Sequence, residues 1–334
     1  PMSFPLYRRP GGVAFLDDDF AYLEMLADVL PERWAVRLFL RPADFINTLQ
    51  QEPPLWDADA WRHREMLDHW REGRSLIPQL LQYWQSDGLR RFALHRVAVV
   101  DYSMPAMNGL QVLDELVNWP GARVLLTGRA DEQIAVSAFN RGLIEQYLPK
   151  QSAEIGQRLT VTVEALLLAA HEPYQQNWRI TLAREQLAVL AAPAVGEALQ
   201  ALSQMHDWVE HVVIGDPFGV LALDARGQVV WLQLETAERL PALAELAQQQ
   251  GLDAGAQQAI REGRQLLDVE LLLALGLPAE SARLREAQLL CSRPALWASV
   301  VQLPDTLCPG ERLSYAAYAA ARAHRQVEEH ASPR

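Results

Sequence analysis

The first half of the sequence predicts an α/β fold, a doubly wound parallel sheet of five strands with helices on both faces. Two apolar runs, Val97–Val100 and Val124–Leu126, are typical of strands that a parallel sheet buries on both faces. Each run ends at a polar residue, and segments with apolar residues at helical spacing alternate with the runs. In such open sheets the functional residues lie at the carboxyl ends of the strands.

The elements of this sheet can be assigned in order along the chain. A short apolar run ends in three consecutive aspartates, and Tyr22, Leu23, Leu26 and Leu30 then recur at the spacing of a helix. The same alternation continues through a second strand and helix. The predicted strands are Val13–Leu16, Val36–Leu40, Val97–Val100, Val124–Leu126 and Glu145–Leu148, and helices are expected to begin near Tyr22, Arg41 and Ile134.

Residues 52–95 interrupt the alternation and predict a helical insertion. They form two or three amphipathic stretches without a strand signal. Because the insertion follows the second helix, it should lie at the end of the sheet opposite the carboxyl ends of the strands. Its tryptophans could form a docking surface, but their amphipathic spacing favours a role in packing. They are Trp56, Trp61, Trp70 and Trp84.

The second half predicts a separate α+β domain at residues 213–330, joined to the first domain (residues 11–170) by a helical linker at 171–212. Its strongest strand signal is a hairpin, 219–223 and 228–232, with a turn at Asp224–Gly227. Two further strands are expected near 287–291 and 296–303. The order of elements weakly resembles a PAS-like sensor or interaction fold. The helical region 152–210 is a candidate surface for pairing two copies into a homodimer.

Four polar residues near the end of this region, His206, Asp207, Glu210 and His211, resemble a metal-binding cluster. We place them on a helix, where histidines five residues apart do not share the face that a zinc site with two histidines four residues apart requires. A solvated helix face is the preferred interpretation.

The charge of the chain limits its partners. Thirty basic and 42 acidic residues give a net charge of −12, and residues 175–334 hold 13 arginines against 19 acidic residues. This balance and the lack of a basic recognition helix make a DNA-binding output unlikely. Two cysteines, Cys291 and Cys308, are too few for a disulfide framework. With neither a signal peptide nor a membrane span in the sequence, we expect a cytoplasmic protein.

Polar residues at the predicted strand ends form a chemical set. Asp17, Asp18 and Asp101 follow two different strands, and hard carboxylate oxygens suit Mg²⁺. Thr127 adds a hydroxyl group. Lys150 adds a flexible ammonium and is the only lysine beside 29 arginines. Because phosphoryl transfer is catalysed largely by positioning and charge neutralisation, these residues suffice for an aspartate nucleophile to take up a phosphoryl group.

These residues resemble the receiver domain of two-component response regulators, the group that includes the chemotaxis protein CheY. The resemblance covers about residues 11–170, and Val97–Gly109 (VAVVDYSMPAMNG) is similar to the family's phosphorylation-site strand and loop. It implies that Asp101 is the phosphoacceptor. It also implies a Mg²⁺ site formed by Asp18 directly, Asp17 through water, Asp101 and the backbone carbonyl of Ser103. In the same resemblance Thr127 is the switch hydroxyl, Lys150 the phosphoryl-binding lysine, and Tyr147 the aromatic residue whose rotamer reports phosphorylation.

Two features depart from the family pattern. The insertion separates Asp18 from Asp101 by far more residues than a compact receiver needs. The family usually has a proline after the lysine, whereas here Gln151 follows Lys150 and Pro149 precedes it. The usual geometry of this loop is therefore not expected to carry over unchanged.

The resemblance implies a signalling protein rather than an enzyme, with a histidine kinase or phosphotransfer protein as phosphodonor and an unknown output protein as its target. Two alternatives remain. A phosphatase of the haloacid-dehalogenase kind uses similar residues, but its nucleophile comes first in the chain, whereas here the acidic pair precedes Asp101. A phosphorylation-independent scaffold would need no intact site, yet the acidic pair, acceptor, threonine and lysine are all present.

Overall fold

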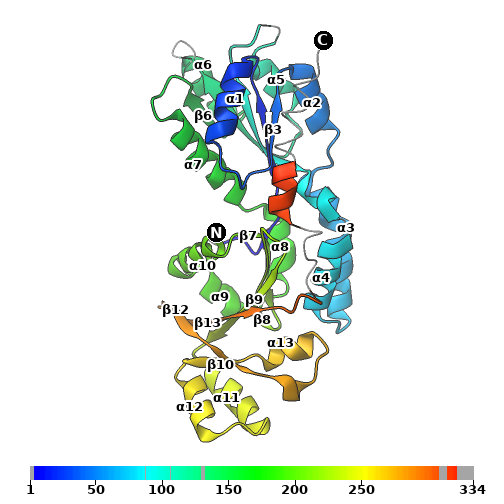
Figure 1. Ribbon diagram of the computed structural model, residues 1–334, viewed down its shortest axis with the longest axis vertical. Coiled ribbons are helices and arrows are strands. Elements are labelled where there is room, and N and C mark those ends of the chain that lie inside the picture. The colour runs from blue at the N-terminus through cyan, green and yellow to red at the C-terminus, as the bar shows by residue number, and fades with distance from the viewer. Residues whose placement is uncertain (1–3, 87, 106, 129–131, 308–313, 322–334) are drawn as a thin grey trace. The chain divides into compact units, whose positions relative to one another are not determined.

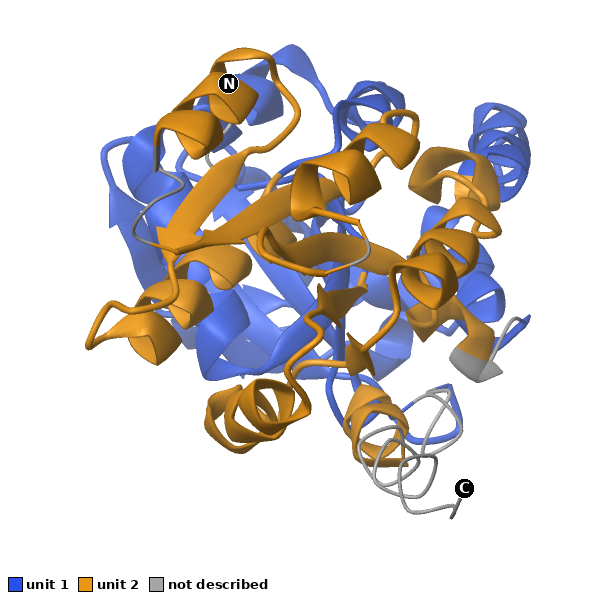
Figure 2. Ribbon diagram, turned by 90° about the horizontal axis from the view of Figure 1, so that it is seen from above, with its two compact units in different colours: residues 1–9, 60–88, 170–314 blue, residues 10–59, 89–169, 315–334 orange. Residues whose placement is uncertain are grey.

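The computed structural model describes residues 4–86, 88–105, 107–128, 132–307 and 314–321. They form two compact units, coloured separately in Figure 2. The parallel-sheet unit comprises residues 10–59, 89–169 and the segment from Tyr315 onward, and the antiparallel-sheet unit comprises the residues before Pro10, 60–88 and 170–314. Cys308 lies outside the described residues, and Cys291 is a free thiol.

The parallel-sheet unit, which contains α1, α2 and β3 in Figure 1, confirms the predicted five-stranded sheet. The order of its strands is β3-β2-β4-β5-β6. Every neighbouring pair of these strands is parallel. Sequence and structure agree on all five strands, with ends that differ by one or two residues. The strands are β2 (Gly12–Leu16), β3 (Val36–Phe39), β4 (His95–Asp101), β5 (Ala122–Thr127) and β6 (Gln146–Pro149).

Helices cover both faces of this sheet, as a doubly wound fold requires. Alternate residues of β2 show the two faces, because Ala14 and Leu16 pack into one hydrophobic cluster and Val13 and Phe15 into the other. The first cluster includes residues of α2 (Pro42–Gln50), α5 (Gly109–Glu115) and α6 (Glu132–Asn140). The second includes residues of α1 (Phe20–Val29) and α7 (Ile155–Leu168).

The predicted insertion is helical and consists of α3 (Leu55–Arg71), α4 (Leu76–Ser86) and the short 3₁₀ helix η1 (Gly88–Phe92). Glu52, just before it, accepts hydrogen bonds from the backbone and ring of His95, the first residue of β4. The insertion therefore starts and ends at the amino end of β4, opposite Asp101, as expected. Trp84 is fully buried, but Trp61 is 70% exposed, so the packing interpretation is wrong for Trp61.

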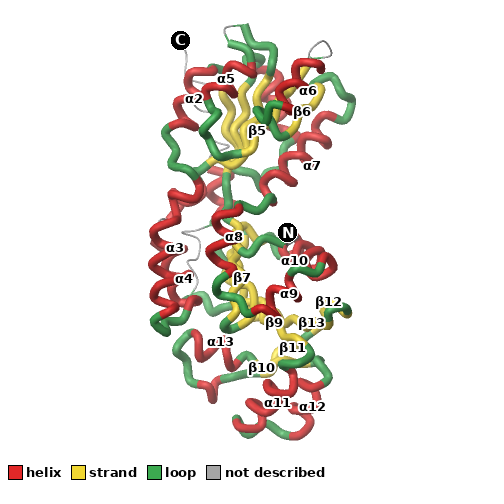
Figure 3. Tube along the Cα trace, turned by 180° about the vertical axis from the view of Figure 1, so that it is seen from behind, coloured by secondary structure: helices red, strands yellow, loops and turns green. Residues whose placement is uncertain are grey.

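The antiparallel-sheet unit contains a six-stranded sheet in the order β1-β7-β8-β9-β13-β12 (Figure 3). The predicted α+β class is confirmed, and the predicted hairpin is β8 and β9. The strands of this sheet are β1 (Tyr7–Arg8), β7 (Trp208–Gly215), β8 (Phe218–Asp224), β9 (Val229–Thr236), β12 (Gln288–Ser292) and β13 (Ala295–Gln302). A separate pair consists of β10 (Gln265–Leu267) and β11 (Leu284–Glu286).

Helices complete this unit. Among all the described residues of the chain, no helix is both long and apolar enough to cross a membrane. Besides the insertion helices of residues 60–88, three helices lie directly before β7 in the sequence, and the others lie between β9 and β11. They are α8 (Glu172–Arg179), α9 (Arg184–Leu190), α10 (Pro193–Met205), α11 (Leu240–Gln249), α12 (Ala254–Arg261), α13 (Val269–Ala274) and the 3₁₀ helix η2 (Ala279–Ser281).

The structure corrects the interpretation of the region around residues 206–212. Helix α10 ends at Met205, and Asp207 adopts a left-handed backbone conformation that separates it from β7. Glu210 and His211 lie on this strand and are buried, whereas the prediction placed them on an exposed helix face. The β-branched residues that follow them favour a strand. The predicted linker is thus three helices and the first half of a central strand.

The same observations change the predicted dimer surface. Residues 152–210 do not form one long helical region but four short helices, α7 to α10, followed by β7. Helix α7 belongs to the parallel-sheet unit and the other three to the antiparallel-sheet unit. The long helical region on which the dimer prediction depended is therefore divided into separate helices of two units, and the homodimer stays a prediction.

A buried carboxylate joins three distant segments of the antiparallel-sheet unit. Glu210 on β7 accepts hydrogen bonds from the Tyr7 hydroxyl (2.8 Å) and from Trp84 Nε1 (2.9 Å). Close by in the same unit, Trp178 Nε1 lies 3.3 Å from His63 Nδ1. The amino-terminal segment and the insertion therefore contribute core residues to a unit that was predicted to begin at residue 213.

Glu235 gives this unit a predicted pH dependence. Its carboxyl group is buried near the end of β9. Burial and the nearby Glu270 carboxylate raise its pKa to about 7, although the hydrogen bond from Gln233 and the charge of Arg239 act to lower it. Because the folded state holds this proton more tightly than the unfolded chain does, its contribution to stability is present below pH 4.5 and is lost as the pH rises through 7.

Replacing Glu235 with glutamine should therefore stabilise the protein at pH 8, by on the order of 1–3 kcal/mol, and have little effect at pH 5. The introduced amide keeps an oxygen that can accept the Gln233 hydrogen bond while removing the buried charge. Urea unfolding of both proteins at the two pH values measures the difference. An equal effect at pH 5 and pH 8 would contradict the assignment.

Candidate functional site

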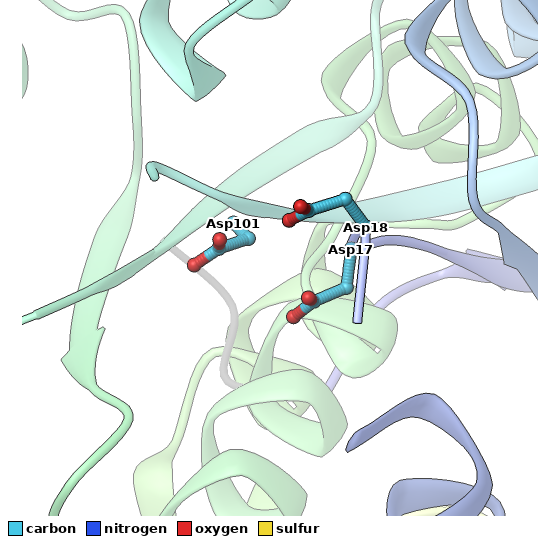
Figure 4. A group of neighbouring side chains, drawn as sticks. All are labelled: Asp17, Asp18 and Asp101. Atoms are coloured by element: carbon cyan, nitrogen blue, oxygen red, sulfur yellow. The ribbon is translucent and has the colours of Figure 1, made fainter. Parts of the chain in front are cut away.

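Three aspartates meet at the carboxyl edge of the parallel sheet. Asp17 and Asp18 follow directly after β2, and Asp101 ends the adjacent strand β4, whose Val100 is paired with Leu16. The sequence predicted these carboxylates at the same edge, and one oxygen of each lies within 4.8 Å of the others (Figure 4). Asp17 and Asp101 are buried, whereas Asp18 is exposed.

Lys150 pairs with two of these carboxylates. Its Nζ lies 2.5 Å from Asp17 Oδ2 and 3.0 Å from Asp101 Oδ1. The main chain fixes the position of Lys150, because its backbone N–H donates to the carbonyl of Thr127 at the end of β5 (2.9 Å). The chain's one lysine therefore lies at the carboxylate cluster although it follows Pro149 rather than preceding a proline.

The charges of this cluster shift the pKa values of its members. Burial raises the pKa of Asp17 above its ordinary value, although the Lys150 ammonium and the N–H of Asp19 act in the opposite direction. Burial alone would lower the pKa of Lys150, but its contacts with Asp17 and Asp101 outweigh burial and raise it. The lysine is thus a firmly held cation among several anions.

The other predicted site residues lie on neighbouring elements. Thr127 is buried at the end of β5, next to β4. Ser103 is exposed in the loop two residues beyond Asp101. Tyr147 lies on β6, where its partly buried side chain packs against the hydrophobic cluster that includes Leu125. Tyr147 therefore contacts the hydrophobic core of this unit.

Gly109 closes the loop that follows Asp101. Its N–H and that of Met104 donate to the carbonyl of Tyr102, and α5 begins at Gly109 behind the cap formed by Asn108. A Cβ atom on Gly109 would lie only 2.4 Å from the carbonyl oxygen of Asp101. The absence of a side chain at Gly109 therefore lets α5 approach the main chain at Asp101.

Replacing Gly109 with alanine should destabilise the protein by about 1–3 kcal/mol, because the main chain at Asp101 has to move. The matched control is Gly156→Ala in α7, where a Cβ would meet only Val29 Cγ2 at an ordinary 3.6 Å. The control should be neutral or stabilising by up to about 1 kcal/mol. Urea denaturation compares the two, and equal stabilities would contradict the proposed close approach.

Tyr22 belongs to this site but was interpreted only as part of the apolar pattern of its helix. Its N–H donates to Asp19 Oδ1 at the start of α1, and its ring centroid lies 4.4 Å from Lys150 Nζ. Burial first, and then the charges of Asp17 and Asp101, raise its pKa to about 12, so the phenol stays neutral. Its place in the first helical turn after the aspartates was the signal available in the sequence.

The residues at this edge fit a magnesium ion. Mg²⁺ prefers hard oxygen ligands at about 2.0–2.1 Å and keeps several waters. The three carboxylates supply such ligands, and one oxygen of each lies within 4.8 Å of the others. Among the described residues, this is the one group of three or more acidic, histidine or cysteine side chains arranged closely enough to hold a metal. The exposure of Asp18 leaves room for waters on one side.

No family model matches the sequence, and no curated protein matches it. Among solved structures, the response regulator LqsR of Legionella pneumophila is similar over 99% of this chain and 97% of its own, with a TM-score of 0.66 and 21% identity. The chain shares the fold of that protein. The predicted combination of a receiver domain with a distinct carboxyl-terminal region is therefore confirmed as a fold.

Other structures match about half of the chain. The signal receiver domain of an HD domain-containing protein from Pseudomonas fluorescens covers 48% of this chain and 95% of its own, with 18% identity and a TM-score of 0.31. An adenylate cyclase from Rhodopirellula baltica covers 50% of this chain and 90% of its own, with 17% identity and a TM-score of 0.33.

Proposed function

We propose that this protein is a cytoplasmic response regulator that accepts a phosphoryl group on Asp101. The observation that carries the proposal is the position of Lys150, whose ammonium lies between Asp17 and Asp101 at the edge where three carboxylates meet. A buried aspartate beside a held cation and a set of metal ligands has the parts that phosphoryl transfer to a carboxylate requires.

In the proposed reaction, an oxygen of Asp101 attacks the phosphorus of the donor. A new O–P bond forms as the bond to the leaving group breaks, and the leaving group keeps the electron pair. Lys150 pairs with a phosphoryl oxygen, and the Thr127 hydroxyl donates a hydrogen bond to another. Mg²⁺, when bound, would neutralise charge on the phosphoryl oxygens.

We assign the metal ligands as the sequence predicted them. Asp18 and Asp101 would bind the ion directly, Asp17 through water, and Ser103 through its backbone carbonyl. Both carboxylate oxygens of Asp17 have contacts within the chain, since its Oδ2 pairs with Lys150 and its Oδ1 accepts the N–H of Asp19 (3.0 Å). A role through water is compatible with these contacts.

The proposed output is a change at the carboxyl edge of the sheet. Phosphorylation would draw Thr127 toward the phosphoryl group and change the packing of Tyr147 on the next strand. The phosphodonor would be a histidine kinase or a phosphotransfer protein. We propose that the signal passes to another protein and not to DNA, and that the protein is not an enzyme, at most hydrolysing its own aspartyl phosphate.

The test uses the full chain and radiolabelled acetyl phosphate. With Mg²⁺ present, label should bind to the protein in a ratio approaching one per chain, and chelation of the metal should abolish it. The label should be lost in alkali, as expected of an acyl phosphate. Equal labelling with and without Mg²⁺, or no labelling at all, would refute the proposal.

A further inference from the structure

Lys150 has a third contact that the carboxylates do not explain. Its ammonium lies against the face of the Tyr22 ring, with 4.4 Å between Nζ and the ring centroid. This distance is well inside the range of about 6 Å at which an ammonium is attracted to an aromatic face. Lys150 is also partly shielded from water, with 21% of its side chain exposed, and partial desolvation strengthens such a contact.

The position of the ring is fixed independently of the lysine. Asp19 caps α1 and accepts the N–H of Tyr22, which places Tyr22 in the first turn of the helix. In the same helix, Leu23 and Leu26 are buried in the cluster on this face of the sheet. A ring on a capped and packed helix is a rigid surface. The lysine side chain, by contrast, is a flexible stem of four carbons that ends in the ammonium group.

The contact matters because the lysine's other partners change during the proposed reaction. Its carboxylate partners are Asp17 and Asp101, and both belong to the proposed metal site. A dication held there would compete with the ammonium for these carboxylates, and the proposed reaction would convert Asp101 to an acyl phosphate. The Tyr22 ring takes no part in either event, so its attraction for the ammonium persists throughout.

We propose that Tyr22 is a positioning residue that holds the Lys150 ammonium at the phosphoryl-acceptor edge through the face of its ring. This inference rests on the proposed function. The ring limits the conformations open to the lysine once its carboxylate partners are engaged, which keeps the ammonium near the phosphoryl oxygen. The role requires the ring and not the hydroxyl group, and therefore distinguishes two substitutions.

The test compares Tyr22→Phe, which keeps the ring face, with Tyr22→Leu, which removes it. Because Lys150 is the only lysine, protein grown with lysine that carries ¹³C at the ε carbon alone gives a single labelled side-chain carbon resonance. The ring should shift the ε-methylene protons upfield in wild type and in Tyr22→Phe, with and without Mg²⁺ and beryllofluoride. In Tyr22→Leu the resonance should move toward the position of an exposed lysine.

The second readout is phosphoryl uptake from acetyl phosphate at saturating Mg²⁺. Tyr22→Phe should react within about twofold of wild type and Tyr22→Leu about five- to tenfold more slowly, in keeping with the strength of a partly desolvated contact. In a Lys150→Met background the leucine substitution should have no further effect. Unequal folding is detected by urea unfolding of each variant.

The two readouts separate the possible failures. An unchanged lysine resonance in Tyr22→Leu overturns the contact, and an altered resonance with unchanged uptake overturns the positioning role. Equal slowing by Tyr22→Phe and Tyr22→Leu also overturns it, because the hydroxyl would then be the group that acts. If wild type takes up no phosphoryl group, the proposed function and the positioning role both fail, while the resonance still reports whether the ring contact exists.

Discussion

Replacing Asp101 with asparagine is expected to abolish phosphoryl uptake from acetyl phosphate while leaving the protein folded. The amide has nearly the same shape as the carboxylate but lacks the anionic oxygen that attacks phosphorus. The substitution also removes one of three carboxylates that crowd the edge of the sheet, so stability should not fall. The expected loss is complete within the sensitivity of radiolabelling.

The control for this variant is Asp114→Asn on α5. Asp114 is exposed and lies in the helix that follows the acceptor loop, so its replacement changes the net charge by the same amount without touching the cluster. It should be labelled like wild type. Labelling of the Asp101→Asn protein at the wild-type level would show that another residue accepts the phosphoryl group.

A fragment of residues 170–314 is expected not to fold, although it contains most of the antiparallel-sheet unit. It lacks β1, which pairs with β7, and it lacks the insertion helix that supplies buried Trp84. Without Tyr7 and Trp84, the buried carboxylate of Glu210 loses two hydrogen-bond donors. The lost packing and the two lost hydrogen bonds to a buried carboxylate together reach the stability of an ordinary domain.

Circular dichroism and urea unfolding measure this outcome, and the full chain is the reference. A cooperative transition of the fragment at the midpoint of the full chain would contradict the assignment of the missing segments to its core.

A single substitution in the full chain isolates one contact. Glu210→Ala should cost about 2–4 kcal/mol, because it leaves the Tyr7 and Trp84 donors without this acceptor, and Glu210→Gln should cost less.

The parallel sheet could be predicted from the sequence because its signals are local. Each strand is a short apolar run with a polar residue at its end, and the parallel register then brings Asp17 beside Asp101. The resemblance added the roles of Thr127 and Lys150, which the spacing of residues alone does not supply. Lys150 contacts both carboxylates, and its role in binding the phosphoryl group stays a prediction.

The errors in the second half have a common physical cause. Strand β1 has only two residues, and its partner in β7 is about two hundred positions away, so no local pattern marks it. The insertion looked self-contained because its helices are amphipathic. Only long-range contacts such as Trp84 with Glu210 assign residues 60–88 to the antiparallel-sheet unit.

Tyr22 shows the same limit within the site itself. An aromatic residue at a helical spacing is most simply explained by packing, and part of its ring does lie against the cluster on that face of the sheet. Its contact with Lys150 joins the first helix to the end of the last strand, a pairing that depends on the sheet order. Such a contact becomes visible only when the strands are placed.

The most direct test of this account is to locate the phosphoryl group on the wild-type chain. After reaction with acetyl phosphate and Mg²⁺, reduction with borohydride converts an aspartyl phosphate to homoserine, which peptide mass spectrometry identifies by its position. The account predicts homoserine at residue 101 and at no other aspartate. Its appearance at Asp17 or Asp18, or its absence from a labelled protein, would contradict the central claim.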